Sequence, residues 1–215
     1  MANLGEKDEL ASNNPDLYFN SAMVNRYLEN YESALSGFHA ASLKDPSLNA
    51  ELEVQKLVKV LIKLEDSIIN KGQMKSKRFA SLVSSLRNEN VKLSLKLVTT
   101  RSLHEGLNKG LSLMVKVLVF IQHENLVPLY YVVSDSEGSC CILSVYGLRN
   151  GVIKESDTVT LLEPSYRSIR VSWKDKTYDF KALRADFRQQ ILLNGRVPSV
   201  QDATCSTIRA QHILP

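Results

Sequence analysis

The chain has 215 residues and a formal net charge of +4, with 44% hydrophobic and 23% charged residues. This ordinary globular composition excludes a low-complexity chain and leaves room for two small domains. The longest apolar stretch, residues 111–121, is interrupted by Lys116 and is too short to cross a bilayer. We therefore expect a soluble protein with no membrane partner.

Residues 14–48 have the pattern of a single tetratricopeptide repeat, a helix, turn and helix with small residues where the two helices touch. The polar segment 1–13 lacks the apolar core of a signal peptide, so we expect a solvated lead-in without secretion. An ordinary antiparallel helical hairpin could show the same spacing. The residues that we expect to pack the repeat are Tyr18, Ala22, Tyr31, Ala34, Phe38 and Ala41, with Pro46 at its end.

A single repeat cannot form a binding groove, because each repeat buries its apolar face only against neighbouring repeats. At least three are normally needed, so we expect the chain to lack upstream repeats. Residues 49–87 then predict a capping helix over 49–70, which ends near Gly72, and a basic helix over 75–87. Residues 88–110 lose the helical period, with 92–99 alternating like a short strand, and are predicted to form a linker that packs on the next domain.

Residues 111–198 predict a small β-barrel, and 199–215 a tail. Short β-branched and aromatic runs alternate there with turn sequences such as Asp135-Ser136-Glu137-Gly138 and Asn194-Gly195. A five-stranded barrel of the oligonucleotide/oligosaccharide-binding (OB) type fits this order, with another small barrel or sandwich as the alternative. The predicted fold class is α+β. The expected strands are 111–122, 128–134, 140–147, 158–162, 168–173, 176–183 and 187–193.

Positive charge concentrates in two stretches. Residues 67–101 hold eight Lys or Arg against one acid, an excess of +7, and residues 167–188 hold seven against three. Both stretches could contact phosphate backbones, although such runs are usually solvated faces. OB folds bind single strands through aromatic and basic side chains. The candidates here are Lys116, Arg167, Arg170, Lys174, Lys176, Tyr146 and Trp173, together with Tyr130, Tyr131 and Tyr178.

Alternation along a strand sends roughly half of these aromatic rings into the core, so the basic side chains are the stronger candidates. Catalysis has little support, because no nucleophile elbow, phosphate-binding glycine loop or paired metal ligands occur. The three cysteines, Cys140, Cys141 and Cys205, form no disulfide framework. We therefore expect no enzyme, no catalytic residue, no metal and no cofactor.

An ordered series of segments resembles the C-terminal half of the tetratricopeptide repeat protein five family, the stress-responsive coactivator Strap. The series includes Leu43-Lys44-Asp45-Pro46, Lys116-Val117-Leu118-Val119-Phe120 and Val133-Ser134-Asp135-Ser136-Glu137-Gly138. It continues through Lys176-Thr177-Tyr178-Asp179-Phe180 and Leu192-Leu193-Asn194-Gly195-Arg196-Val197-Pro198, and covers most of the chain.

This resemblance implies a non-enzymatic adaptor of nucleus and cytoplasm that acts with an acetyltransferase coactivator in stress-responsive transcription. It also implies a link to tubulin autoregulation, in which the repeats capture nascent tubulin at the ribosome. The repeats that form that groove have no counterpart here, so no groove residue is assigned. The alternative function is a module that binds single-stranded nucleic acid or the ribosome through the basic face of the barrel.

Overall fold

The computed structural model describes residues 14–87, 94–124 and 127–204. Within them the chain forms two compact units. The first comprises residues 14–61 with 171–177, and the second comprises residues 62–170 with 178–204. The expected lead-in, 1–13, and most of the expected tail lie outside the described residues. Among the described helices, none combines the length and the apolar character that a membrane span needs.

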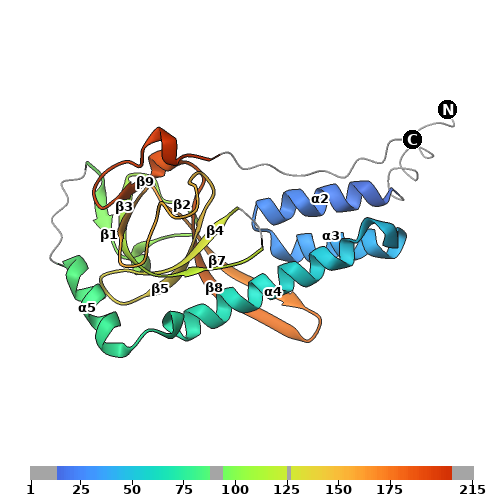
Figure 1. The fold of residues 1–215 in the computed structure, drawn as a ribbon, viewed down its shortest axis with the longest axis horizontal. Coiled ribbons are helices and arrows are strands. Elements are labelled where there is room, and N and C mark those ends of the chain that lie inside the picture. The colour runs from blue at the N-terminus through green and yellow to red at the C-terminus, as the bar shows by residue number, and fades with distance from the viewer. Residues whose placement is uncertain (1–13, 88–93, 125–126, 205–215) are drawn as a thin grey trace. The chain divides into compact units, whose positions relative to one another are not determined.

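Helices α2 (Pro15–Tyr27) and α3 (Tyr31–Lys44) form the hairpin of the first unit (Figure 1). Helix α2 starts where a cap is available, because the Asn14 side chain accepts a hydrogen bond from the N–H of Asp16 at 3.0 Å. Pro15 occupies the first turn, where its missing N–H costs nothing. After α3, the short 3-10 helix η1 (Pro46–Leu48) leads into α4 (Ala50–Ile69).

The two hairpin helices approach closely at Gly37 and Ala22. A Cβ atom at Gly37 would lie 2.9 Å from the Cβ of Ala22, so only glycine fits there. Beside this contact, the rings of Phe19 and Phe38 meet edge to face with centroids 5.3 Å apart. The side chains of Ala22, Tyr31, Ala34, Phe38 and Ala41 are all buried in the hairpin.

The remaining two predicted packing residues lie outside this core. The Tyr18 side chain is half-buried, and the Nζ of Lys44 lies 5.2 Å from its ring centroid. The neighbouring Phe19 is the buried aromatic of α2. Pro46 is exposed and opens η1, where it ends the hairpin.

The second unit contains the end of α4, the 3-10 helix η2 (Lys71–Gln73), α5 (Ser76–Arg87) and a curled sheet. Gly72 adopts a φ of +62°, and a side chain there would meet Val119 at 2.4 Å. This glycine therefore lets the chain turn directly against the sheet. The sequence pattern placed the end of the capping helix at the same residue.

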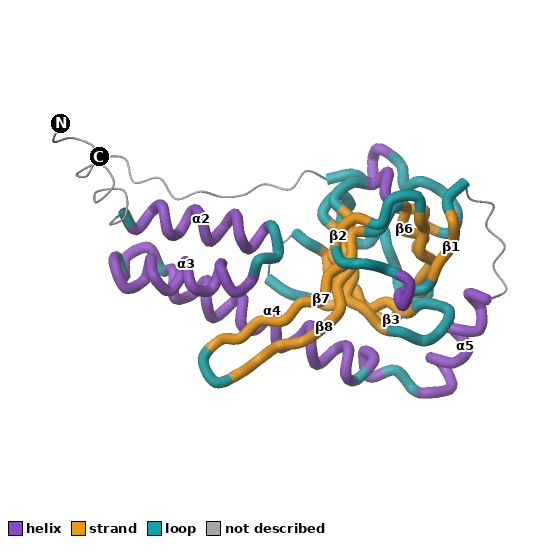
Figure 2. Tube along the Cα trace, turned by 180° about the vertical axis from the view of Figure 1, so that it is seen from behind, coloured by secondary structure: helices purple, strands orange, loops and turns teal. Residues whose placement is uncertain are grey.

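The sheet has nine described strands and curls into a half-barrel (Figure 2). Its order is β2-β7-β8-β5-β4-β3-β6-β9, with β1 paired to β3 off this path. The β5–β8 and β1–β3 pairs are parallel. The α+β prediction with an OB-type barrel is confirmed. The strands are β1 (Lys96–Val98), β2 (Gly106–Leu107), β3 (Leu111–Ile121), β4 (Leu129–Ser134), β5 (Cys140–Val145), β6 (Thr158–Leu162), β7 (Ser165–Trp173), β8 (Lys176–Ala185) and β9 (Ile191–Leu193).

Alternate residues of these strands face one apolar core. Along β3 the inward residues are Leu113, Val115 and Val117, and the other large members include Tyr131, Leu143, Val159, Leu161, Leu183 and Ile191. Ser112, Met114 and Lys116 of β3 point to the opposite face of the sheet, up to the register shift between Val117 and Val119. That face is also buried, since Ser112 is 0% and Met114 is 5% exposed.

Two segments differ from the sequence prediction. Residues 88–110 were expected to be a linker, but their described part contributes β1 and β2 to the sheet. The expected strand at 187–193 is shorter, because residues 188–190 form the 3-10 helix η4 (Arg188–Gln190) before β9. There the side chain of Gln190 accepts hydrogen bonds from the backbone N–H groups of Asp186 and Phe187. In a continuous strand, these N–H groups would be available for pairing with a neighbouring strand.

Candidate nucleic-acid and protein interfaces

The strands that OB folds use to bind single strands are buried on both faces here. All six residues of β4 are buried, as are five of the six residues of β5. Tyr130 and Tyr131 point to opposite faces, yet they are only 5% and 1% exposed. Tyr131 belongs to the core, and the ring of Tyr130 lies 5.0 Å from that of His123. Neither ring is available for stacking on a base.

Tyr146 and Tyr178 are buried as well, at 1% and 2% exposure. The guanidinium of Arg184 lies over the Tyr146 ring at 4.1 Å from its centroid and covers it. The structure therefore removes Tyr146 from the candidate nucleic-acid face. Tyr146 directly follows β5, and alternation could not reveal its burial because both faces of that strand are covered.

The end of α4 contributes to the layer outside the sheet in the second unit. Lys63 donates a hydrogen bond to the carbonyl of Gln122 at 3.1 Å, and Glu65 accepts one from the backbone N–H of Asp179 at 3.0 Å. These bonds attach the helix to β8 and to the residue after β3.

Lys116 lies inside the protein, not on its surface. It is 8% exposed, and its Nζ donates a hydrogen bond to the Thr158 hydroxyl at 2.6 Å. The cause is its even position on β3, whose outer face is buried beside β6. The prediction that Lys116 contacts phosphate is therefore wrong, because this lysine is buried and hydrogen-bonded.

The other predicted basic residues lie on β7, the following turn and the start of β8. Arg170, Lys174 and Lys176 are exposed, whereas Arg167 is half-buried. Trp173 is also half-buried, and its ring meets that of His39 edge to face with centroids 5.9 Å apart. Of the seven proposed nucleic-acid residues, three therefore remain fully solvent-accessible: Arg170, Lys174 and Lys176.

The arginines of the first basic stretch, residues 67–101, bind acidic side chains or backbone carbonyls within the second unit. Arg78 pairs with Glu155 at 3.5 Å, and Arg101 pairs with Glu137 at 3.4 Å. Arg87 donates to the carbonyl of Ser136 at 3.1 Å. These contacts give the arginines a structural role at a partly solvated surface, where such pairs contribute little energy.

The described residues provide neither a metal-binding site nor a site for thiol chemistry. No group of three or more His, Cys, Asp or Glu side chains there is placed to hold a metal ion. Burial raises the pKa of the Cys141 thiol to about 12. A thiol of that kind is protonated and unreactive at neutral pH.

The structure exposes one large aromatic side chain that the sequence pattern placed in a strand. Phe187 is 66% exposed and stands at the end of β8, beside η4. The available signal was the polar run Arg188-Gln189-Gln190, which breaks the apolar alternation after it. That run indicates an exposed turn better than a strand.

Comparison with known proteins places these features in one family. Tetratricopeptide repeat protein 5 of Homo sapiens is 29% identical over 220 aligned residues, which cover 95% of this chain and 50% of that protein. The proteins of the same name from Bos taurus and Mus musculus are 28% identical over the same shares. The chain spans about half the length of the curated relatives it matches.

The sequence model of the tetratricopeptide repeat protein 5 OB fold domain matches residues 94–207. This range includes β1 and β2, in agreement with their place in the sheet. It covers more than half of the chain, and the resemblance seen in the sequence is confirmed. The chain belongs to the tetratricopeptide repeat protein 5 family.

Proposed function

We propose that this chain is a non-enzymatic protein-interaction adaptor. The observation that carries the proposal is the burial of the face that other OB folds offer to single strands, including Tyr130 and Tyr146. A barrel whose nucleic-acid face is filled by its own side chains is suited to scaffolding. Family membership supports the same function.

The helical hairpin adds a second reason. Leu17, Val24 and Leu28 lie seven and four residues apart on α2 and its C-cap, and each is more than 40% exposed. That spacing puts the three side chains on one side of the helix. In repeat proteins such an apolar side packs on a neighbouring repeat, so this hairpin is suited to an array of repeats.

The finer role follows from the family resemblance. We place the adaptor with an acetyltransferase coactivator in stress-responsive transcription, and with nascent tubulin at the ribosome in tubulin autoregulation. Both roles imply that the protein works in the nucleus and in the cytoplasm.

A binding titration tests this function. The purified chain is titrated against the acetyltransferase coactivator, against ribosomes that carry nascent tubulin, and against single-stranded RNA. We expect saturable binding to a protein partner that persists at physiological salt. Binding to RNA alone, with affinity that falls steeply as salt rises, would replace the adaptor with a nucleic-acid module.

The second candidate function is contact with single-stranded nucleic acid or the ribosome through the exposed basic side chains of β7 and β8. Its support is the exposure of Arg170, Lys174 and Lys176. The triple change to glutamate should abolish RNA binding and flatten its salt dependence. Lys59→Glu with Lys109→Glu, at exposed lysines elsewhere, is the matched control.

A further inference from the structure

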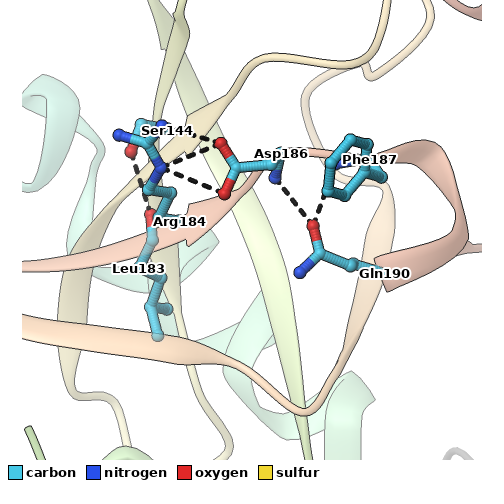
Figure 3. A network of polar contacts seen from close by, with 6 residues as sticks. All are labelled: Ser144, Leu183, Arg184, Asp186, Phe187 and Gln190. Carbon is cyan, nitrogen blue, oxygen red and sulfur yellow. Dashed lines mark hydrogen bonds and ion pairs between the residues drawn. The ribbon is translucent and has the colours of Figure 1, made fainter. Parts of the chain in front are cut away.

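Phe187 is an exposed aromatic side chain on a tightly held loop. Its backbone N–H and that of Asp186 both donate to the Oε1 of Gln190, at 2.9 and 2.7 Å (Figure 3). The two bonds close the turn between β8 and η4. The backbone that carries the Phe187 side chain is held in this way, so little loop entropy is lost when the side chain binds a partner.

The base of the loop is clamped as well. Arg184 holds the carboxylate of Asp186 with both nitrogens of its fork, at 2.7 to 3.1 Å (Figure 3). The same guanidinium rests on the Tyr146 ring. On the other side, a Cβ at Gly147 would lie 2.6 Å from the carbonyl oxygen of Asp186 and 3.0 Å from the Cα of Phe187. These contacts make the Phe187 loop, residues 186–190, rigid.

Two further apolar side chains are exposed on the segment that meets this loop. Arg188 donates from Nη1 to the carbonyl of Pro198 at 2.8 Å and so joins the loop to residues 196–203. On that segment Val197 is 48% and Val200 is 71% exposed. The same region thus presents an aromatic and two aliphatic side chains to solvent.

Arginines surround these apolar residues without carboxylate partners. Among the described residues, Arg149 and Arg188 bind only backbone carbonyls through their side chains, and Arg196 forms no ion pair. Of the nearby acids, Asp186 pairs with Arg184, whereas Asp202 accepts the N–H of Ser199 at 2.9 Å and keeps its negative charge. Three arginines thus face one carboxylate that has no cation partner among the described residues. The rim is therefore positively charged.

We propose that this region, the Phe187 surface, binds an acidic peptide segment that carries apolar side chains. The surface consists of Phe187, Val197, Val200, Arg149, Arg188 and Arg196. Aromatic and arginine side chains dominate the binding energy of protein interfaces, and the planar arginine fork matches a carboxylate. The inference rests on the proposed adaptor function and names the partner class for one of its surfaces.

The two valines favour a peptide over a nucleic acid. Base stacking needs flat aromatic rings, and Phe187 supplies the single large aromatic among the six residues of this surface. Val197 and Val200 can bury aliphatic side chains but cannot stack on bases. The arginines would then pair with glutamates or aspartates beside the buried apolar residues.

The test uses the full chain and a short fluorescent peptide of glutamates interspersed with leucines. We expect saturable binding that weakens as salt rises. Phe187→Ala should weaken it about tenfold or more, as expected of an anchor residue, and Arg188→Glu with Arg196→Glu should do the same. Leu43→Ala, at a position that is 73% exposed, and Lys59→Glu with Lys109→Glu are the matched controls and should change nothing.

Several results would overturn the inference. The peptide could fail to bind saturably, or Phe187→Ala could bind as well as the unchanged chain. The surface would be a nucleic-acid surface if a single-stranded RNA bound more tightly than the peptide and if the same variants weakened that RNA binding. Circular dichroism checks that each variant is folded. If the unchanged chain binds a protein partner but not the peptide, and Phe187→Ala binds that partner fully, the adaptor function stands and this surface falls.

Discussion

The buried carboxylate of Asp135 accepts a hydrogen bond from the backbone N–H of Thr100, 35 residues earlier in the chain, at 2.9 Å. The same carboxylate accepts the N–H groups of Glu137 and Ser139, at 3.0 and 2.9 Å. Asp135 is 1% exposed. One side chain thus shapes the turn between β4 and β5 and ties to it the segment between β1 and β2.

We expect Asp135→Ala to lower the free energy of unfolding of the second unit by about 3 kcal/mol, because one buried and two partly buried N–H donors lose a charged acceptor. Urea unfolding followed by circular dichroism measures the loss. Asp66→Ala, at an exposed aspartate of α4, is the control and should stay within about 0.5 kcal/mol. Equal effects of the two changes would show that Asp135 does not hold this junction.

Gly37→Val should force α2 and α3 apart, because its first side-chain carbon would lie 2.9 Å from the Cβ of Ala22 and 3.3 Å from the carbonyl of Tyr18. The expected loss is about 1 to 3 kcal/mol, typical of overpacking. Thermal unfolding, followed by the helical circular-dichroism signal at 222 nm, would check this loss as a lower midpoint temperature. Ser36→Val, exposed on the same helix, separates the clash from helix propensity.

Glu53 should make the first unit sensitive to acid. Burial alone would raise the pKa of its carboxyl, but hydrogen bonds from Lys56 and Arg26 and their charges outweigh it and hold the pKa below its usual value. Stability from this group is present above the unfolded-state pKa of about 4.3 and is lost as pH falls through the lower folded-state pKa.

Glu53→Gln should therefore cost about 1 to 2 kcal/mol near neutral pH, and the difference from the unchanged chain should shrink below about pH 4. Unfolding measured across this pH range gives the comparison. A difference that stays constant down to acid pH would contradict the role of the Glu53 charge.

The Cys141 thiol should resist alkylation in the native protein. It is 1% exposed, and burial raises its pKa to about 12. Burial also raises the pKa of the neighbouring Cys140 thiol, which is half-buried. Iodoacetamide near pH 8, where a free thiol of pKa about 8.5 reacts readily, should leave Cys141 unmodified until denaturant is added. Peptide mass mapping reads the result, and rapid labelling of the native chain would contradict it.

Local patterns in the sequence predicted the elements whose causes are local. The Ala22, Ala34 and Phe38 positions followed the period of a helix pair, and Asp135-Ser136-Glu137-Gly138 predicted a turn from its own residue types. Residues 92–99, which contain β1, alternate like a short strand, but this segment and β2 were assigned to a linker because two or three strand residues carry too little pattern to place them in a sheet. They form through pairing with β3 and β7, which lie elsewhere in the chain.

The candidate site was less predictable than the fold. Alternation along β3 and β5 separates two faces, but it does not say whether the second face is open to solvent. Lys116 and Tyr146 were candidates on that account, and the structure buries both. Phe187 was missed because its exposure depends on the loop that Gln190 closes.

The sequence by itself determined the helical hairpin, the strand-rich domain, the OB-type α+β class and the family, because these depend on periodicity, turn residues and an ordered series of segments. Only the tertiary structure decided which faces of the sheet are covered and which charges remain in solvent. Burial depends on residues far apart in the chain, such as Lys116 and Thr158. That long-range packing put Lys116 and Tyr146 into the protein interior and left Arg170, Lys174 and Lys176 in solvent.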